Sequence, residues 1–407
     1  MSQSLEAIIN AGLGPQDAVD LGAGTYMSRG IANTYLITSS EGDLLINTGL
    51  PTEAPEIKAR FARVSTNPLR AIVFTQGHPD HVGGWSQLTG PGVETIAQAN
   101  HADVREYWRR LHPFYASRIA RLWGLIRPDE LAAALPPEAD VTTTFIDTHQ
   151  VSLGERRIEL ISTPGGEATD ALVVWLPEER TAFVGNLLGP VFGHVPNLYT
   201  IRGDKIRSAQ AFLRSIDRVI ALQPARLVNG HDVHDGAEEI AATLQRVRAA
   251  TVHLRDKTIE GMNEGRSLWE LMRTVDLPDD LRLPQLHGKV PWIVRAVFEE
   301  HVGWFRYEST TELYATPPSA VWDDVVELAG GPERLVERAR RHVDAGRPLE
   351  ALHLIDMVAA RAPSSATAPV KGAALQLLRE RSGDENFSET RWLDQEINAT
   401  TATAEGA

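Results

Sequence analysis

The spacing of apolar residues divides this chain into two parts. Up to about residue 235, short runs rich in β-branched and aromatic residues alternate with turn residues. These runs predict strands over residues 34–40, 41–49, 69–77, 141–147, 157–163, 171–177, 181–186 and 225–232. Helical patterns over 100–123 and 203–222 are interspersed with them, so the sequence predicts a layered α/β or α+β domain.

Beyond about residue 236, apolar residues recur at spacings of three and four. This pattern predicts helices within 236–265, 323–363 and 366–383, separated by Gly or Pro. The helix pairs resemble tetratricopeptide repeats, although they keep no strict period. We expect a first domain over 1–265, an all-helical domain over 266–395 and a flexible tail over 396–407.

Composition narrows the partners and the chemistry. Among 407 residues, 54 acidic and 40 basic side chains give a formal charge of -14, without a Lys/Arg-rich run, which argues against nucleic-acid and anionic-membrane surfaces. No stretch reaches the roughly 18 apolar residues of a membrane span, and the first 20 residues lack the features of a secretory signal. The expected location is therefore the cytoplasm. The absence of cysteine leaves His, Asp and Glu as metal ligands.

The segment TQGHPDHVGG, residues 75–84, is the strongest candidate for chemistry. His78, Asp80 and His81 follow a predicted strand and precede two glycines, so a loop can direct their side chains toward one point. Imidazole and carboxylate groups are ligands that Zn(II) and Fe(II) accept in the absence of thiolate. Glu167 and His231 also follow predicted strands and could complete the site. The isolated residues His101, His112 and His149 are given no role.

These motifs resemble those of a known superfamily. TQGHPDHVGG is similar to the H-x-H-x-D-H signature of the metallo-β-lactamase fold, and NTG at 47–49 resembles the Asp-Thr-Gly turn that precedes it. Three features resemble the alkylsulfatase branch: Glu167 in TPGGEATDAL, the segment NLYTIRG at 197–203, and the region from HGKVPW at 287 onward.

The resemblance extends over nearly the whole chain and implies a fold and a function. The implied fold is an αββα sandwich over 1–265 followed by a helical dimerisation domain, and the implied assembly is a homodimer through the C-terminal helices. The implied function is that of a metal-dependent hydrolase, in which metal-bound water or hydroxide acts on a sulfate ester or related small anionic substrate.

The resemblance also assigns residues. His78 and Glu167 correspond to ligands of a first metal, and Asp80, His81 and His231 to ligands of a second. Arg202 and Asn197 correspond to the groups that hold sulfate oxygens, which suits a planar guanidinium and an amide. Substrate contacts are further expected from Tyr199, His194 and His287, the last of these beside Lys289 at the site entrance.

Two positions depart from the family pattern. Gln76 replaces the first histidine of the signature and is at most a weak, neutral ligand. Gly185 stands where the alkylsulfatases carry a bridging glutamate. We therefore predict a mononuclear or asymmetric site that keeps Asp80, His81 and His231, with one or two zinc ions expected and Fe or Mn possible. Glu167 or His78, released from ligation, could serve as general base.

The substrate remains open at this point. The chain ends before the lipid-carrier-like domain of the family, and the segment 186–197 is longer than the family's, so a smaller or aromatic substrate is expected. Aromatic residues after the metal motif could line its pocket or belong to the core: Trp85, Tyr107, Trp108, Phe114, Tyr115 and Trp123. The alternatives are a mononuclear zinc or iron lyase or hydrolase for a non-sulfate metabolite, and an inactive metal-binding dimer. The C-terminal helices could also pack on the first domain instead of forming a dimer.

Overall fold

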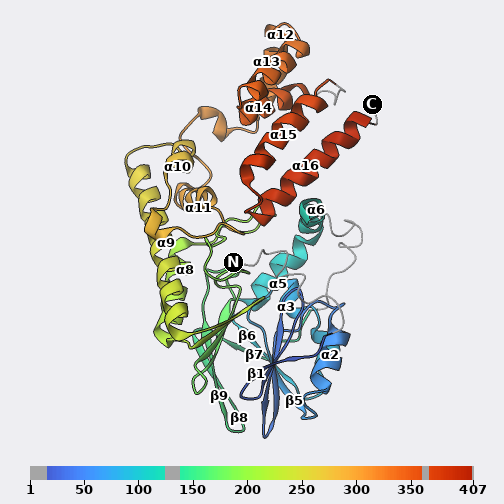
Figure 1. The fold of residues 1–407 in the computed structure, drawn as a ribbon, viewed down its shortest axis with the longest axis vertical. Helices are drawn as coiled ribbons and strands as arrows, with labels where there is room; N and C mark the ends of the chain where they lie inside the picture. Colours follow the sequence, from blue (N-terminus) through green and yellow to red (C-terminus); the bar gives the residue numbers. More distant parts are fainter. Residues whose placement is uncertain (1–15, 124–137, 360–365, 406–407) are drawn as a thin grey trace. The chain divides into compact units, whose positions relative to one another are not determined.

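A computed structural model describes residues 16–123, 138–359 and 366–405 of the chain (Figure 1). The described residues form two compact units, one within the ranges 1–116 and 129–301 and the other within 117–128 and 302–407. The division at residues 301–302 differs from the boundary expected at 265, because helices α10 and α11 belong to the first unit.

Two β-sheets form the centre of the first unit. A seven-stranded sheet has the order β1-β2-β3-β4-β5-β6-β7, and a six-stranded sheet has the order β13-β12-β11-β10-β9-β8. The first comprises β1 (Val19–Gly22), β2 (Thr25–Ser28), β3 (Thr34–Ser39), β4 (Gly42–Ile46), β5 (Leu69–Val73), β6 (Glu94–Gln98) and β7 (Thr143–Phe145). The second comprises β8 (Thr148–Leu153), β9 (Arg156–Ser162), β10 (Leu172–Leu176), β11 (Thr181–Gly185), β12 (Arg226–Asn229) and β13 (Val233–Asp235). Each predicted strand overlaps a strand of one of these two sheets. The strand predicted over residues 141–147, for example, overlaps β7.

The main core lies between the two sheets. Alternate residues of β3 and β4, such as Ile37 and Leu44, meet Leu160 and Val174 of the second sheet, and all four side chains are buried. This follows from the period of two along a strand, which directs every second side chain to the same face. A second cluster fills the outer face of the first sheet, where Phe61 of helix α2 packs.

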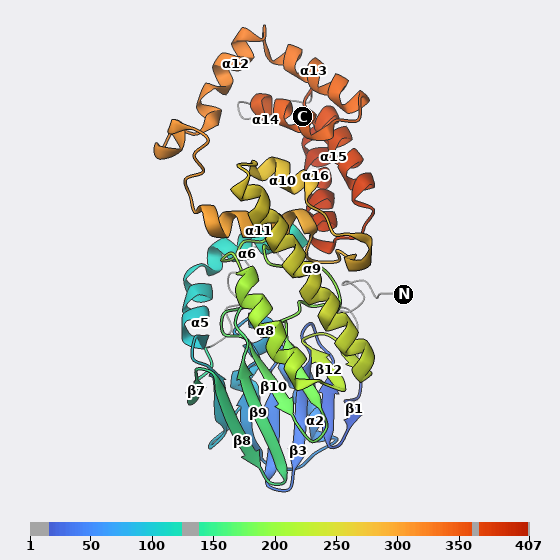
Figure 2. The same cartoon turned by 90° about the vertical axis from the view of Figure 1, so that its left-hand side faces the viewer.

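Helices cover the outer faces of the sandwich, as Figure 2 shows. Helix α2 (Ala54–Ala62) lies on the first sheet, and α8 (Ala209–Leu222) and α9 (Ala237–Asn263) lie on the side of the second. The first unit also contains α3 (Pro79–Val82), α4 (Trp85–Leu88), α5 (His101–Arg110), α10 (Leu268–Thr274), the 3-10 helix η1 (Asp279–Leu281) and α11 (Val290–Val302), which ends at the unit boundary. The predicted αββα sandwich is confirmed.

Two predicted helices differ in extent from those observed. The helix expected over 100–123 is interrupted at Leu111, which separates α5 from α6 (His112–Trp123). The helix expected from residue 203 begins only at Ala209, because Ser208 has an extended backbone and its hydroxyl caps the helix by accepting from Ala211 N at 3.2 Å. The residues before Ser208 therefore form a loop, which carries the predicted anion-binding segment.

The second unit is helical, as expected for the C-terminal region. Its elements are η2 (Thr310–Leu313), η3 (Pro318–Val321), α12 (Trp322–Leu328), α13 (Pro332–Asp344), α14 (Pro348–Ala359), α15 (Ala368–Ser382) and α16 (Phe387–Glu405). The expected tail at 396–407 is instead helical as far as Glu405. Glu396 anchors this helix to α15, since its carboxylate lies 3.0 Å from Lys371 Nζ. No helix among the described residues has the length and apolarity needed to cross a bilayer.

The candidate residues follow the carboxyl ends of strands. Strands β4 and β5 are parallel, as are β11 and β12, while β9 and β11 both run antiparallel to β10. The loops after these five strands therefore emerge at corresponding edges of the two sheets. The hydrogen bond from Leu172 N to Thr75 O (2.9 Å) joins the two edges there.

Candidate active site

Asp80, His81 and His231 form a group with metal-ligand geometry. The first two residues lie on the short helix α3 after β5, and His231 follows β12. One ligand atom from each residue lies within 4.8 Å of the others. His81 is fully buried, and its Nε2 atom has no hydrogen-bond partner. The nearest charged group is the Asp80 carboxylate, whose Oδ2 lies 3.5 Å away. A buried nitrogen of this kind requires a partner, and a cation would supply it once Nε2 carries the lone pair.

Electrostatics keep this group in protonation states that suit a cation. Burial lowers the pKa of His81 to about 4, against the opposing effect of Asp80. Burial alone would raise the pKa of Asp80, but the neighbouring His81, His78 and His231 outweigh it and lower that pKa. At neutral pH the group therefore combines an uncharged His81 with an ionised Asp80. This donor set fits a divalent cation such as zinc, iron or manganese.

His231 is oriented by the backbone. Its Nδ1 donates to the carbonyl oxygen of Ile31, which leaves the Nε2 lone pair for a ligand. The Ile31 N–H in turn donates to the carboxylate of Glu53 at 2.8 Å, and the same carboxylate accepts from Leu50 N at 2.9 Å. Glu53 thus fixes the loop whose carbonyl sets the tautomer of His231.

The side chains of Gln76 and His78 contact each other. The Gln76 Oε1 atom accepts from Asn186 N at 3.0 Å, and its Nε2 lies 2.8 Å from His78 Nδ1. Both ends of the amide thus have protein partners. Burial, with a smaller effect of Arg202, lowers the pKa of His78.

Glu167 is held by protein cations. Its Oε1 lies 3.6 Å from Arg207 Nη1 and 3.6 Å from His287 Nε2, and its Oε2 accepts from Asn186 Nδ2 at 3.0 Å. Burial opposes ionisation, but the hydrogen bond to His287 and the charge of Arg207 hold the pKa of Glu167 well below its usual range. A carboxylate with so low a pKa is a weak base. With His78 and Gln76 also engaged, these residues do not fit a first metal ion.

Gly185 lies against Gln76 and Thr75. A Cβ atom built there would meet Thr75 Oγ1 at 2.7 Å and Gln76 Oε1 at 3.3 Å, and the backbone has φ +52°. The two departures noted in the sequence are thus spatial neighbours. The space that a side chain at position 185 would need is partly filled by Thr75 and the amide of Gln76.

The segment 197–207 brings two arginines to the same region. The Arg202 guanidinium lies 5.4 Å from the ring centroid of Trp108, whose ring also contacts His78 edge-on at 5.6 Å. Asp204 lies 3.8 Å from Arg202 and 3.4 Å from Arg207. Asn197 is buried, and its Oδ1 atom has no hydrogen-bond partner.

The other expected substrate contacts have protein partners of their own. The Tyr199 hydroxyl donates to Glu299 at 2.6 Å, and His194 Nε2 lies 3.2 Å from the carbonyl of Leu188. Burial and the charge of His287 lower the pKa of His194 to about 3. Of these residues, only His287 contacts a member of the predicted ligand set, namely Glu167.

The aromatic residues after the metal motif divide between core and surface. Trp108 and Tyr115 are buried, Trp85 donates to Thr95 at 3.0 Å, and Phe114 is exposed. The hydroxyl groups of Tyr107 and Tyr115 contact each other. The side chain of Trp123 lies outside the described part of the chain.

Sequence reasoning missed three residues of this region: Asn47, Asn186 and Arg207. Asn47 Nδ2 lies 3.0 Å from His81 Nδ1, although the two residues are 34 positions apart in the sequence. Asn186 hydrogen-bonds to both Gln76 and Glu167. A second arginine five residues after Arg202 was a visible signal for Arg207, but the expected helix from residue 203 concealed it.

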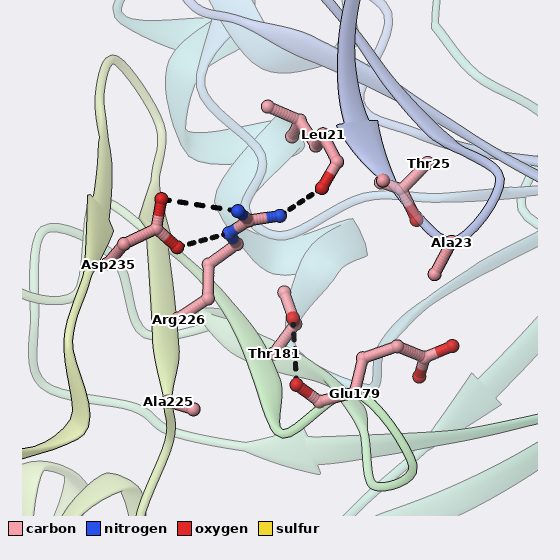
Figure 3. Close-up of a pocket in the computed structure, with 9 residues that line it drawn as sticks. Leu21, Ala23, Thr25, Glu179, Thr181, Ala225, Arg226 and Asp235 are labelled. Carbon is pink, nitrogen blue, oxygen red and sulfur yellow. Dashed lines mark hydrogen bonds and ion pairs between the residues drawn. The ribbon is translucent and has the colours of Figure 1, made fainter.

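A separate pocket of about 310 Å³ lies at the other end of the strands (Figure 3). Its lining includes Thr181 and Arg226, which begin β11 and β12, whereas the candidate site follows the ends of these strands. The Arg226 guanidinium binds Asp235 and the carbonyl of Leu21 (Figure 3). These contacts join β1 to the second sheet, so the charged residues that line this pocket have a structural role.

Comparisons with known proteins agree with this arrangement. The model of the metallo-beta-lactamase superfamily matches residues 27–231, and the model described as alkyl sulfatase dimerisation matches residues 268–389. A linear primary-alkylsulfatase from Pseudomonas sp. (strain ATCC 19151) is 28% identical over 332 residues, covering 75% of this chain and 62% of that protein. The alkyl/aryl-sulfatase BDS1 of Saccharomyces cerevisiae is 23% identical over 355 residues, covering 79% of this chain and 54% of its own length.

A solved structure shares the fold. The stereoselective inverting sec-alkylsulfatase Pisa1 from Pseudomonas sp. superposes with a TM-score of 0.81 at 19% identity, covering 96% of this chain and 66% of that one. This chain therefore spans less than two thirds of the length of each of these three relatives.

Proposed function

Because this chain belongs to the metallo-beta-lactamase superfamily and carries a region that matches the alkyl sulfatase dimerisation family, we propose that it is a metal-dependent hydrolase of small anionic esters. Sulfate esters are the leading substrate class. Support comes from the two sequence relatives named above, which are an alkylsulfatase and an alkyl/aryl-sulfatase, and from the charge of Arg202, which acts on His78, two residues from Asp80.

Asp80, His81 and His231 would hold one divalent cation, with zinc as the first candidate and iron or manganese as alternatives. When bound, such a cation lowers the pKa of a coordinated water and polarises a substrate oxygen. The protein contributes an ionised Asp80 and a His81 that burial keeps uncharged. Glu53 and Ile31 orient His231 for the same purpose.

The guanidinium group of Arg202 carries the proposal. The charge of Arg202 helps to lower the pKa values of His78 and Glu167, and the charge of Glu167 acts on the pKa of His81. Arg202 is therefore close enough to the candidate metal ligands to influence their ionisation. Arg202 would bind the sulfate group through parallel N–H donors, with the Asn197 amide beside it. Arg207 would serve a different role, since Glu167 and the Asn197 carbonyl already engage it.

The test is a metal analysis of the purified chain combined with a substrate panel. The panel contains sulfate esters of short alkyl and aryl alcohols together with the matching phosphate and carboxylate esters. We expect about one metal per chain, sulfate-ester hydrolysis that a chelator abolishes, and loss of activity in Asp80→Asn. Absence of metal together with inactivity across the panel would refute the proposal.

A second candidate is a mononuclear lyase or hydrolase for a non-sulfate metabolite. The observation in its favour is Asp204, which lies within 3.8 Å of both arginines and partly offsets their charge. A carboxylate substrate would find the same donors as a sulfate. Arg202→Ala separates the two candidates: a large rise in KM for sulfate esters favours the first, and an unchanged KM favours the second.

A further inference from the structure

The side chain of Asn47 is fixed by a backbone donor. Asn47 follows β4 with φ +62°, a left-handed conformation that Asn and Asp tolerate better than most residues. Its Oδ1 accepts from Thr75 N at 2.9 Å and from Thr75 Oγ1 at 3.1 Å. Because a backbone N–H can only donate, the amide oxygen must lie on this side. The amide nitrogen therefore faces His81 Nδ1, at 3.0 Å.

Gln76 makes the same arrangement with His78. Its oxygen is fixed by Asn186 N at 3.0 Å, and its nitrogen faces His78 Nδ1 at 2.8 Å. An amide nitrogen only donates, so the Nδ1 atoms of both histidines must accept. A neutral imidazole has one accepting and one donating nitrogen, so the proton of each ring lies on Nε2.

His231 has the opposite tautomer. Its Nδ1 faces the carbonyl oxygen of Ile31, an acceptor, so this nitrogen carries the proton and Nε2 carries the lone pair. Metal-binding histidines commonly donate their second ring N–H to a carbonyl or carboxylate in this way. The candidate metal site thus contains one imidazole preset as a ligand and one, His81, preset as a proton carrier.

We propose that Asn47 is a positioning residue that sets the metal affinity of the site by holding His81 in its Nε2-protonated tautomer. To bind a cation through Nε2, His81 must move its proton to Nδ1, where it meets the N–H of Asn47. If the amide turns to accept that proton, its nitrogen meets the Thr75 N–H instead. Either rearrangement opposes binding, so the site holds its cation more weakly than its three ligands would otherwise allow.

Asn47→Asp is the change that isolates this effect. Aspartate has the same shape and tolerates the left-handed backbone at this position. One carboxylate oxygen can keep the contacts with Thr75, and the other can accept a hydrogen bond from the Nδ1–H of His81. Changes in such supporting groups alter metal affinity by roughly 10–100-fold, so we expect Asn47→Asp to bind Co(II) at least about tenfold more tightly than the natural chain.

Asn229→Asp is the matched control for charge. Its Oδ1 accepts from His231 N at 2.8 Å and from Asp232 N at 2.7 Å, and its Nδ2 donates to Pro190 O at 3.5 Å, so these three partners are backbone groups and not imidazole nitrogens. The substitution adds the same charge close to the same ligand group. A gain in Co(II) affinity much smaller than that of Asn47→Asp is expected. Equal gains in the two variants would show that charge alone acts and would overturn the affinity assignment.

The tautomers themselves can be read by neutron diffraction from a deuterated, metal-free crystal of the full chain. We expect deuterium on Nε2 of His81 and His78, and on Nδ1 of His231. Deuterium on Nδ1 of His81 would overturn the inference. The affinity claim rests on the proposed metal-dependent function, and the tautomer claim does not. If no variant binds Co(II), the affinity claim and the proposed function fail together, whereas the deuterium positions still decide the tautomer claim independently.

Discussion

The carboxylate of Glu167 lies 3.6 Å from the guanidinium of Arg207, and both side chains are buried. The resemblance noted in the sequence implies that Glu167 is a ligand of a first metal. Here a protein cation, together with His287 and the amide of Asn186, surrounds that carboxylate. A guanidinium therefore supplies the positive charge that this side of the site would otherwise take from a metal ion.

The two arginines are expected to respond differently to truncation. Arg207→Ala leaves Glu167 buried without its cation, and breaking a buried pair costs about 3–5 kcal/mol of unfolding free energy. Arg202→Ala instead removes the proposed sulfate contact, and loss of a charged hydrogen bond of about 1.5–3 kcal/mol corresponds to at least about a tenfold rise in KM. Chemical denaturation and steady-state kinetics on both variants provide the measurement, with each variant as the other's control. Similar stability losses in both variants would contradict this division of roles.

Restoring a histidine at position 76 is expected to raise the metal content of the protein. Gln76→His removes the amide that faces His78 Nδ1 and adds a ligand nitrogen, so metal per chain should rise above that of the natural chain. Metal analysis after dialysis checks this. An unchanged content would contradict this expectation and would mean that Glu167, held by Arg207, still excludes the first metal.

Adding Gly185→Glu to that variant is expected to reduce stability. The left-handed backbone and the contact of 2.7 Å with Thr75 cost about 1–3 kcal/mol for any side chain at this position. Gly185→Ala, which brings the strain without a ligand, is the control in urea denaturation. If Gly185→Ala leaves the unfolding free energy unchanged, the strain argument is wrong.

His194 is expected to make stability depend on pH. Its pKa is about 3 in the folded protein and roughly 6.5 in an unfolded chain, so the unfolded chain takes up a proton first as pH falls. The stability contribution is therefore intact above pH 6.5 and declines as pH falls toward 3. Between pH 7 and 5 the loss amounts to about 2 kcal/mol. His194→Gln, whose amide can still donate to Leu188, should lose correspondingly less stability over this interval; equal losses would exclude His194 as the cause.

The helical unit is expected to mediate a homodimer. Val321, Val325 and Leu328 lie at spacings of four and three on η3 and α12, and Leu328 is 87% exposed. The matched dimerisation model includes these residues. Leu328→Glu should shift the chain toward monomer in light scattering at several concentrations. Ile146→Glu, at an exposed position of the first unit, should not; a monomeric natural chain would contradict the expectation.

The sequence was most informative where partners are adjacent in the chain. Strands were predictable because apolar runs end in turn residues, and Asp80 and His81 were identifiable because they share one short loop. The contacts of Asn47 with His81 and of Arg207 with Glu167 join residues 34 and 40 positions apart, and no local pattern reports such pairs. The helix over 396–405 was missed for the same reason, since Lys371 anchors it from α15.

The fate of Gln76 shows a further limit of the sequence. Its presence indicated the loss of a metal ligand, but the sequence could not show that its amide is held between Asn186 and His78. The proximity of Gly185 to the same amide was also invisible, because Gly185 ends β11 of the second sheet, whereas Gln76 lies in the loop that follows β5 of the first. The structure thus turns two separate departures into one local rearrangement.

A metal-edge anomalous difference map of a crystal of the natural chain, grown with its bound metal, tests the central claim most directly. The account predicts one peak within coordinating distance of Asp80, His81 and His231, with Gln76 still hydrogen-bonded to His78 and Arg207 still beside Glu167. Two peaks, with His78 and Glu167 as ligands of the second, would contradict it.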